Sequence, residues 1–173
     1  SAPKLTQEQT INELGQKITS VSFLTADLSL LIGDSSGLVS QWSKVRGKSN
    51  GFTMQKIRVF KVSDKAVVSI NAEQRRKGFM TVDADGTLGV YHSTSEREMI
   101  KEQGDGSGAI ASAISPRANA VIVQSGNNKI SFWQVDNEHP EVSLRSIWQK
   151  VWYESYPKPD YIWQSSSANS DFE

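Results

Sequence analysis

The residues best suited to chemistry in this sequence are its two histidines, His92 and His139. They lie 47 residues apart in unrelated contexts, and no HExxH, GxSxG or glycine-rich phosphate loop accompanies them. Zinc hydrolysis, acyl transfer and nucleotide binding therefore lack the spacing that each requires. Cysteine is absent, which excludes disulfides, thiolate catalysis and thiolate-ligated metals. We expect no catalytic residues, no metal and no cofactor, and hence a protein that is not an enzyme.

The acidic stretch 81–86 resembles part of a calcium loop. An EF-hand would place acidic ligands at its third and fifth positions and glycine at its sixth, which matches Asp83, Asp85 and Gly86. The first ligand would then be Thr81 and the twelfth, which must be a bidentate acid, would be His92. Because both ends fail, we expect Asp83 and Asp85 to cap backbone amides in a hairpin turn.

The most uneven charge lies between residues 44 and 65, where seven basic residues face only Asp64. The alternation in this stretch places Ile57 and Val59 on one side of a strand and Lys56 and Arg58 on the other. The candidate residues for contact with an anion or a partner are Lys44, Arg46, Lys48, Lys56, Arg58 and Lys61.

Two interpretations of this basic strand stay open. Lysines on an exposed outer strand deter edge-to-edge association, which makes a solvated protective face one of them. The other is a surface for anionic lipid headgroups, an acidic partner or phosphate itself. The basic run 74–77 is expected to be a solvated hairpin turn.

Three stretches of the chain align when the aromatic residue that closes each is used as the anchor. They are residues 18–42, 67–91 and 109–133, which end at Trp42, Tyr91 and Trp133. Each contains two apolar runs, a tight turn of the Asp-x-x-Gly or Gly-Asn-Asn kind, and a third alternating run into the anchor. Such turns supply the positive φ that hairpins need, so each unit is predicted to be an antiparallel β-meander. The chain is expected to be all-β, with any helix confined to the first 17 residues.

A period of about 40 to 45 residues with this order of parts resembles the WD-repeat blade of a β-propeller. Ser115-Pro116 falls where that family often has a turn between its first two strands. No unit carries the Trp-Asp dipeptide, so the blades are divergent. We predict a leader in residues 1–17, four-stranded WD-like blades in 18–147, and an aromatic juxtamembrane segment in 148–173.

Closure of such a propeller requires about four to eight blades, and three are recognisable. Met54–Val62 and Arg97–Lys101 can supply outer strands. The missing part is expected either from sequence upstream of Ser1 or from a second copy of the chain. The first residue is not Met, and a Ser-rich stretch precedes the end, so we expect a piece cut from a longer protein with added residues at its front.

The last part of the chain is dense in aromatic residues. One interpretation is a blade strand, Val142–Trp152, followed by a linker, and the other is an interfacial belt beside a membrane. The residues expected near the membrane are Trp148, Trp152, Tyr153, Tyr156, Tyr161 and Trp163.

The segment WYESYPKPDYIWQSSSANSDFE resembles the sequence just ahead of the first transport-core helix in permease subunits of bacterial phosphate ABC transporters, the PstC-like kind with an enlarged loop between their first two membrane helices. The resemblance covers Trp148–Glu173, about a seventh of the chain. It implies a location on the bacterial inner membrane, with this domain in the periplasm and a transmembrane helix after Glu173. It also implies contact with the other permease subunit and with the periplasmic phosphate-binding protein.

Two classes of function follow. The first is a non-catalytic accessory domain of a phosphate permease, for docking or regulation, and the second is a free-standing WD-like scaffold for protein interactions.

Lys and Arg balance Asp and Glu at 19 each, so the chain lacks the overall positive charge expected of a protein that binds nucleic acid. No apolar run approaches the roughly 18 residues of a membrane helix.

Overall fold

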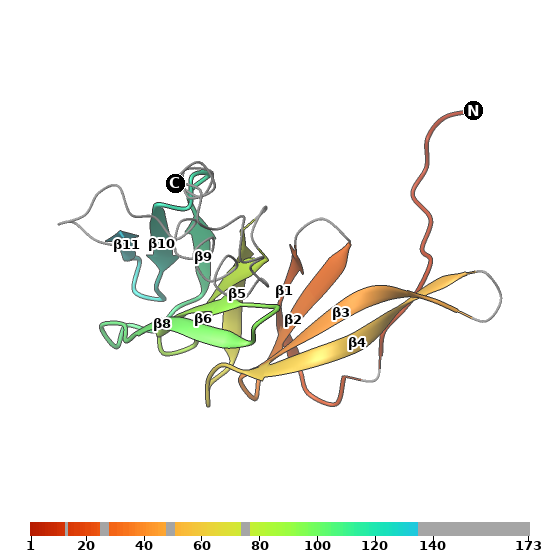
Figure 1. Ribbon diagram of the computed structural model, residues 1–173. Helices are drawn as coiled ribbons and strands as arrows, with labels where there is room; N and C mark the ends of the chain where they lie inside the picture. The colour runs from red at the N-terminus through yellow and green to blue at the C-terminus, as the bar shows by residue number, and fades with distance from the viewer. Residues whose placement is uncertain (13, 25–27, 48–50, 74–76, 135–173) are drawn as a thin grey trace, which may run out of the picture.

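The structure, a computed structural model, describes residues 1–12, 14–24, 28–47, 51–73 and 77–134. Within these ranges the chain is all-β, with three antiparallel sheets that follow one another along the sequence (Figure 1). The described part of the first 17 residues contains neither strand nor helix. The prediction of an all-β fold is confirmed for the described residues.

Sheet 1 consists of β1 (Ile18–Leu24), β2 (Ser29–Asp34), β3 (Leu38–Arg46) and β4 (Phe52–Lys61), paired in that order. β2 pairs with β3 only as far as Trp42, whereas β4 follows β3 to its end. Ser43–Arg46 and Phe52–Gln55 therefore form a two-stranded hairpin, which we name the arm and which projects beyond the sheet in Figure 1. Gln9 contacts this hairpin, because its side-chain amide exchanges two hydrogen bonds with the backbone of Met54.

Sheets 2 and 3 repeat the meander. Sheet 2 is formed by β5 (Val67–Ala72), β6 (Gly78–Asp83), β7 (Leu88–His92) and β8 (Arg97–Glu102). Sheet 3 has three described strands, β9 (Ala111–Ile114), β10 (Ala120–Gln124) and β11 (Ile130–Gln134). The predicted anchors lie in β3, β7 and β11, and the predicted outer strands correspond to β4 and β8. The proposed strand Val142–Trp152 lies outside the described residues.

Sheet 2 is the centre of the fold because both of its faces are buried. One face carries Phe79 and Tyr91, which pack with Leu31, Val39 and Phe60 of sheet 1. The ring of Phe79 meets Phe60 edge-on at 5.2 Å and stacks on Tyr91 at 5.5 Å between centroids. These contacts make the first of two separate cores.

The second core lies between sheets 2 and 3. Met80, Val82 and Val90 pack there against Val121 and Val123 of β10. Successive residues of β6 thus point alternately into the two cores, and every residue of β6 and β7 is buried.

The outward faces of sheets 1 and 3 are apolar and uncovered by described residues. Cross-strand pairing places Val21 and Val59 on the face of sheet 1 that points away from sheet 2, where they are 68% and 45% exposed. Ile122 and Phe132, a cross-strand pair, lie on the corresponding outward face of sheet 3. Both ends of the stack therefore present the kind of surface that a further sheet would bury.

The first strands of the three sheets lie side by side and are joined by short polar side chains. The hydroxyls of Thr19 and Ser20 in β1 each donate to the carbonyl oxygen of Val67 in β5 at 2.7 Å. The amide of Asn71 in β5 donates to Ser112 of β9 at 2.6 Å. The small size of serine and threonine lets these strands approach closely.

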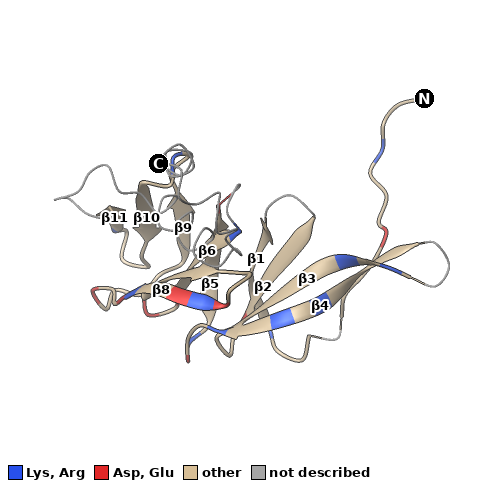
Figure 2. Cartoon of the chain, in the orientation of Figure 1, with Lys and Arg blue, Asp and Glu red and all other residues tan. Residues whose placement is uncertain are grey.

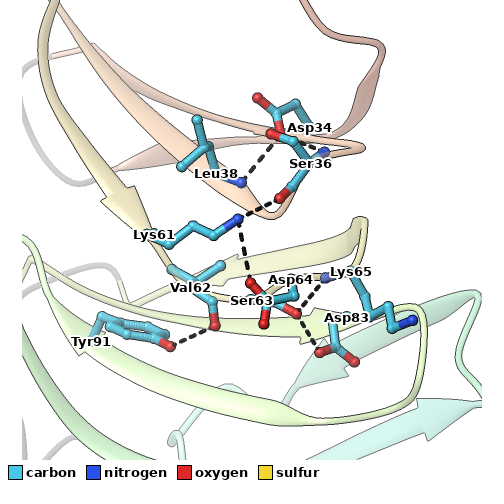
Figure 3. A network of polar contacts seen from close by, with 10 residues as sticks. All are labelled: Asp34, Ser36, Leu38, Lys61, Val62, Ser63, Asp64, Lys65, Asp83 and Tyr91. Carbon is cyan, nitrogen blue, oxygen red and sulfur yellow. Dashed lines mark hydrogen bonds and ion pairs between the residues drawn. The ribbon is translucent and has the colours of Figure 1, made fainter.

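Equivalent aspartates organise the turns before β3 and β7. Oδ1 of Asp34 accepts hydrogen bonds from the backbone of Ser36 and Leu38, as Figure 3 shows. Oδ1 of Asp83 accepts from the backbone of Asp85 and Thr87 in the same pattern. The predicted cap is confirmed for Asp83.

The anchor tryptophans of the first and third units make the same side-chain hydrogen bond. The indole N–H of Trp42 donates to Ser40 at 2.8 Å, and that of Trp133 donates to Ser131 at 3.1 Å. In sheet 2 the corresponding pair is Gly89 and Tyr91, whose ring lies where a side chain at Gly89 would be. The third repeat unit therefore keeps the Ser-x-Trp pair of the first.

The turn at Gly37 provides a test of the junction between sheets 1 and 2. Its φ is +92°, its carbonyl accepts hydrogen bonds from Val62 and Ser63, and a Cβ there would overlap the carbonyl of Ser63. Gly37→Ala should lower the free energy of unfolding by about 2–3 kcal/mol, measured by urea titration. Gly126→Ala is the matched control, because a Cβ at Gly126 meets nothing within 4 Å. Equal stability of the two variants would contradict this arrangement.

Candidate functional site

The predicted basic set is divided among three places. Lys44 and Arg46 lie on the arm, where their cationic groups stand 4.9 and 5.6 Å from the ring centroid of Phe52. Lys56 is exposed near the base of the arm, and Figure 2 shows basic residues in blue along β3 and β4. These side chains give the arm a positive surface around an exposed aromatic ring.

Lys61 contacts the turns at the other end of β4. Its ammonium donates to the carbonyl of Ser36 at 2.7 Å and lies 3.7 Å from Asp64, as Figure 3 shows. The neighbouring Ser63 donates to Asp83 at 2.7 Å and so joins the turns of sheets 1 and 2. Lys61 is therefore engaged in the junction between the two sheets rather than placed with the residues of the arm.

The position of Arg58 contradicts the predicted alternation of side chains along the strand. Its guanidinium is half-buried between sheets 1 and 2 and donates to the carbonyl of Ser93, whereas Val59 on the opposite face is exposed. The reason is a bulge: Lys56 pairs with Trp42 and Arg58 pairs with the adjacent Gln41, which leaves Ile57 as the extra residue. The bulge places Lys56 and Arg58 on opposite faces, although their spacing predicts the same face.

A small polar pocket surrounds Arg58 where sheets 1 and 2 diverge at the base of the arm. Its volume is about 130 Å³. It is lined by Leu24, Ser29, Gln41, Ser43, Ile57 and Arg58 of sheet 1 and by Lys77, Ser93 and Thr94 of sheet 2. The backbone N–H of Ser93 donates to the carbonyl of Lys77 at 3.0 Å, which fixes the two sheet 2 turns beside each other.

Two of the residues that line this pocket have a buried side-chain oxygen without a partner among the described residues. These oxygens are Oε1 of Gln41 and the hydroxyl of Ser93, whose residues are 6% and 0% exposed. Leaving such groups unsatisfied costs about 1–3 kcal/mol each, so the wall of this pocket is an unusually polar part of the interior. We take this pocket as the candidate site.

The signals for this site were weak in the sequence. Arg58 was predicted, but as part of an exposed face, and Lys77 was expected in a solvated turn. Gln41 and Ser93 gave no signal, because their burial together depends on sheet packing rather than on a motif.

His92 lies close to the pocket but does not line it. It is fully buried, and burial first, then Lys77 and Arg58, lower its pKa. Ser95 donates its backbone N–H toward Nδ1 at 3.4 Å, which places the proton of the neutral ring on Nε2. In the described part of the chain, Nε2 has no hydrogen-bond partner.

Two other hollows lie between sheets 2 and 3. The larger, about 370 Å³, is mostly apolar and is lined by Leu88, Ile100 and Trp133 among others, up to Gln134 at the limit of the described residues. The smaller, about 220 Å³, lies beside Asp105, whose pKa is lowered by hydrogen bonds from Ser107 and then by Lys129 at 3.0 Å. Both hollows lack the buried, unpartnered polar groups found beside Arg58, among the residues described.

Several predicted positions fall outside the described residues. They are Lys48, His139, Trp148, Trp152, Tyr153, Tyr156, Tyr161 and Trp163. Within the described ranges, no group of three or more His, Cys, Asp or Glu gathers to hold a metal ion. None of the described segments forms a helix long and apolar enough to span a membrane.

Comparison with known proteins gives no relative from which to transfer a function. No protein-family model matches this sequence, and no curated protein matches it.

The lowered pKa of His92 predicts how stability depends on pH. Below about pH 6.5 the unfolded chain takes up a proton that the folded chain resists, so the free energy of unfolding should fall as the pH drops. The slope contributed between about pH 7 and about pH 5.5 is at most roughly 1.4 kcal/mol per pH unit. His92→Gln should remove this slope in denaturant titrations, while His139→Gln serves as the control. An unchanged slope in His92→Gln would contradict the burial of a neutral imidazole.

Proposed function

We propose that this chain is a non-catalytic extracytoplasmic domain of a phosphate ABC transporter permease, and that its sheets are WD-like blades of a larger propeller. The blade assignment is supported by the repeated Ser-x-Trp pair, by the aspartate-capped turns and by the side-by-side position of β1, β5 and β9, the first strand of each sheet. The uncovered faces at both ends of the stack suit further blades.

The observation that carries an interaction role is the arm. It leaves the body of sheet 1 as two paired strands, with Lys44, Arg46 and Phe52 together and Lys56 at its base. A projecting cationic hairpin with an exposed aromatic ring suits an acidic protein surface, because charge steers the encounter and the ring supplies contact area. The proposed role is docking or regulation of the transporter.

The transporter itself is proposed from the resemblance of Trp148–Glu173 to the permeases. The partners would be the periplasmic phosphate-binding protein and the other permease subunit, on the periplasmic side of a bacterial inner membrane. Membrane helices would lie outside these residues. The alternative, a free-standing WD-like scaffold, is favoured by the fact that the described structure consists of meanders alone.

Binding to the cognate transporter proteins tests this proposal. The purified chain should bind the periplasmic phosphate-binding protein or the partner permease subunit in biolayer interferometry. Lys44→Glu, Arg46→Glu and Lys56→Glu combined should weaken that binding at least about tenfold, mainly through slower association.

Charge reversal elsewhere provides the control. Lys17→Glu, Lys65→Glu and Lys101→Glu change the net charge equally at exposed positions away from the arm, and should leave affinity nearly unchanged. Equal loss in both triple variants would indicate unspecific attraction. Binding to neither transporter protein would refute the permease assignment and favour the scaffold.

A further inference from the structure

Each of the three sheets has two unlike faces. One face carries the anchor aromatic, which is Trp42, Tyr91 or Trp133, and we name it the anchor face. We name the opposite face, formed by the alternate residues of the same strands, the back face. The way in which these faces meet inside the chain shows what the two ends of the stack can bind.

Both junctions between sheets pair a back face with an anchor face. Leu31 and Val39, on the back face of sheet 1, pack with Tyr91 on the anchor face of sheet 2. Met80, on the back face of sheet 2, belongs to the core against which Trp133 of sheet 3 packs. The described chain therefore makes the same kind of contact twice, in the same direction along the sequence.

The two ends of the stack are complementary under this rule, because sheet 1 ends in an anchor face and sheet 3 ends in a back face. Trp42 itself is 9% exposed, so the accessible part of the first surface lies beside it. Its exposed apolar residues are Val21, Phe23 and Val59. The exposed apolar residues on the back face of sheet 3 are Ile122, Ile130 and Phe132.

The exposed apolar area is large enough for a stable interface. A fully exposed residue of this size presents about 150–250 Å², so the six exposed fractions come to roughly 500–900 Å² in one copy of the chain. Two copies that cover each other's end surfaces would bury about 1,000–1,700 Å² of apolar side chain, and specific interfaces bury about 1,200–2,000 Å² in all.

The sheets also fan out in a way that allows two copies to close on each other. Their first strands are joined by short hydrogen bonds, whereas the hollow of about 370 Å³ opens between later strands of sheets 2 and 3. A head-to-tail contact forms a ring when its rotation closes. Two copies supply six sheets, which lies within the range of about four to eight in closed propellers.

We propose that two copies of this chain associate head to tail and close a ring of six sheets. The back face of sheet 3 in each copy lies against the anchor face of sheet 1 in the other. The inference goes beyond the docking role, and it rests on the packing of the sheets rather than on the permease assignment.

Sedimentation equilibrium of the purified chain tests the proposal. At concentrations on the order of 10 µM the chain should have the mass of two copies, with no growth at higher concentration. Val21→Lys and Phe132→Glu should each weaken dimerisation about a hundredfold or more, because each places a charge in both apolar contacts of the dimer.

Mixing the two variants identifies which faces meet. A dimer with one copy of each variant has one contact that contains both substitutions and one contact that contains neither. The mixture should therefore regain much of the dimer that each variant alone has lost. In a dimer with like faces together, one of the two variants would dimerise normally and mixing would restore nothing.

Folding is checked separately from association. Val21 and Phe132 are both exposed in a single copy, so the variants should keep the β-sheet circular dichroism spectrum of the unmodified chain. Ile130→Glu, on the same face as Phe132, provides a second variant of that surface. Leu28→Glu is the control, because Leu28 is exposed in the connection between β1 and β2, and it should dimerise as the unmodified chain does.

Four results would overturn the proposal: a monomer at about 100 µM, loss of the dimer in only one of the two surface variants, a mixture that does not regain the dimer, or a mass that keeps growing with concentration. The docking experiment is independent of this one. A chain that dimerises in this way but binds no transporter protein would refute the permease assignment and leave this inference intact. A monomer that docks would do the reverse.

Discussion

The structure depends on the burial of the central sheet on both faces. Every residue of β6 and β7 is buried, and alternate side chains of β6 enter two different cores. A sheet with two apolar faces needs a neighbour on each side, because a face left in water forfeits about 25 cal/mol for each Å² of apolar area. Phe79 shows this most clearly, since it is 0% exposed and its contacts with Phe60 and Tyr91 depend on both sheets.

The candidate pocket is a consequence of the same packing and of one irregularity. Sheets 1 and 2 are in contact around Phe79 but separate toward the arm, where the bulge at Ile57 turns Arg58 inward. Without the extra residue, Lys56 and Arg58 would share a face and the pocket would lose its guanidinium. The arm and the pocket therefore have a common origin in the way β4 leaves the body of sheet 1.

The sequence predicted those parts of the fold that depend on local chemistry. The spacing of Trp42, Tyr91 and Trp133 and the Asp-x-x-Gly turns were sufficient to find the meanders, because strand alternation and positive φ leave clear patterns. The inward position of Arg58 could not be predicted, since a bulge shows in the pairing of two strands and not in one of them. Gln41 and Ser93 come together from different sheets, a relation that no single-sequence pattern records.

Native-state hydrogen exchange tests the central claim most directly. If the buried central sheet holds the fold together, the amides of Met80 and Val82 in β6 should exchange only by global unfolding, with an opening free energy equal to that from urea denaturation. The arm amides, such as that of Val45, should open at lower free energy. Exchange of the β6 amides by local opening, while sheet 1 or sheet 3 stays protected, would contradict the account.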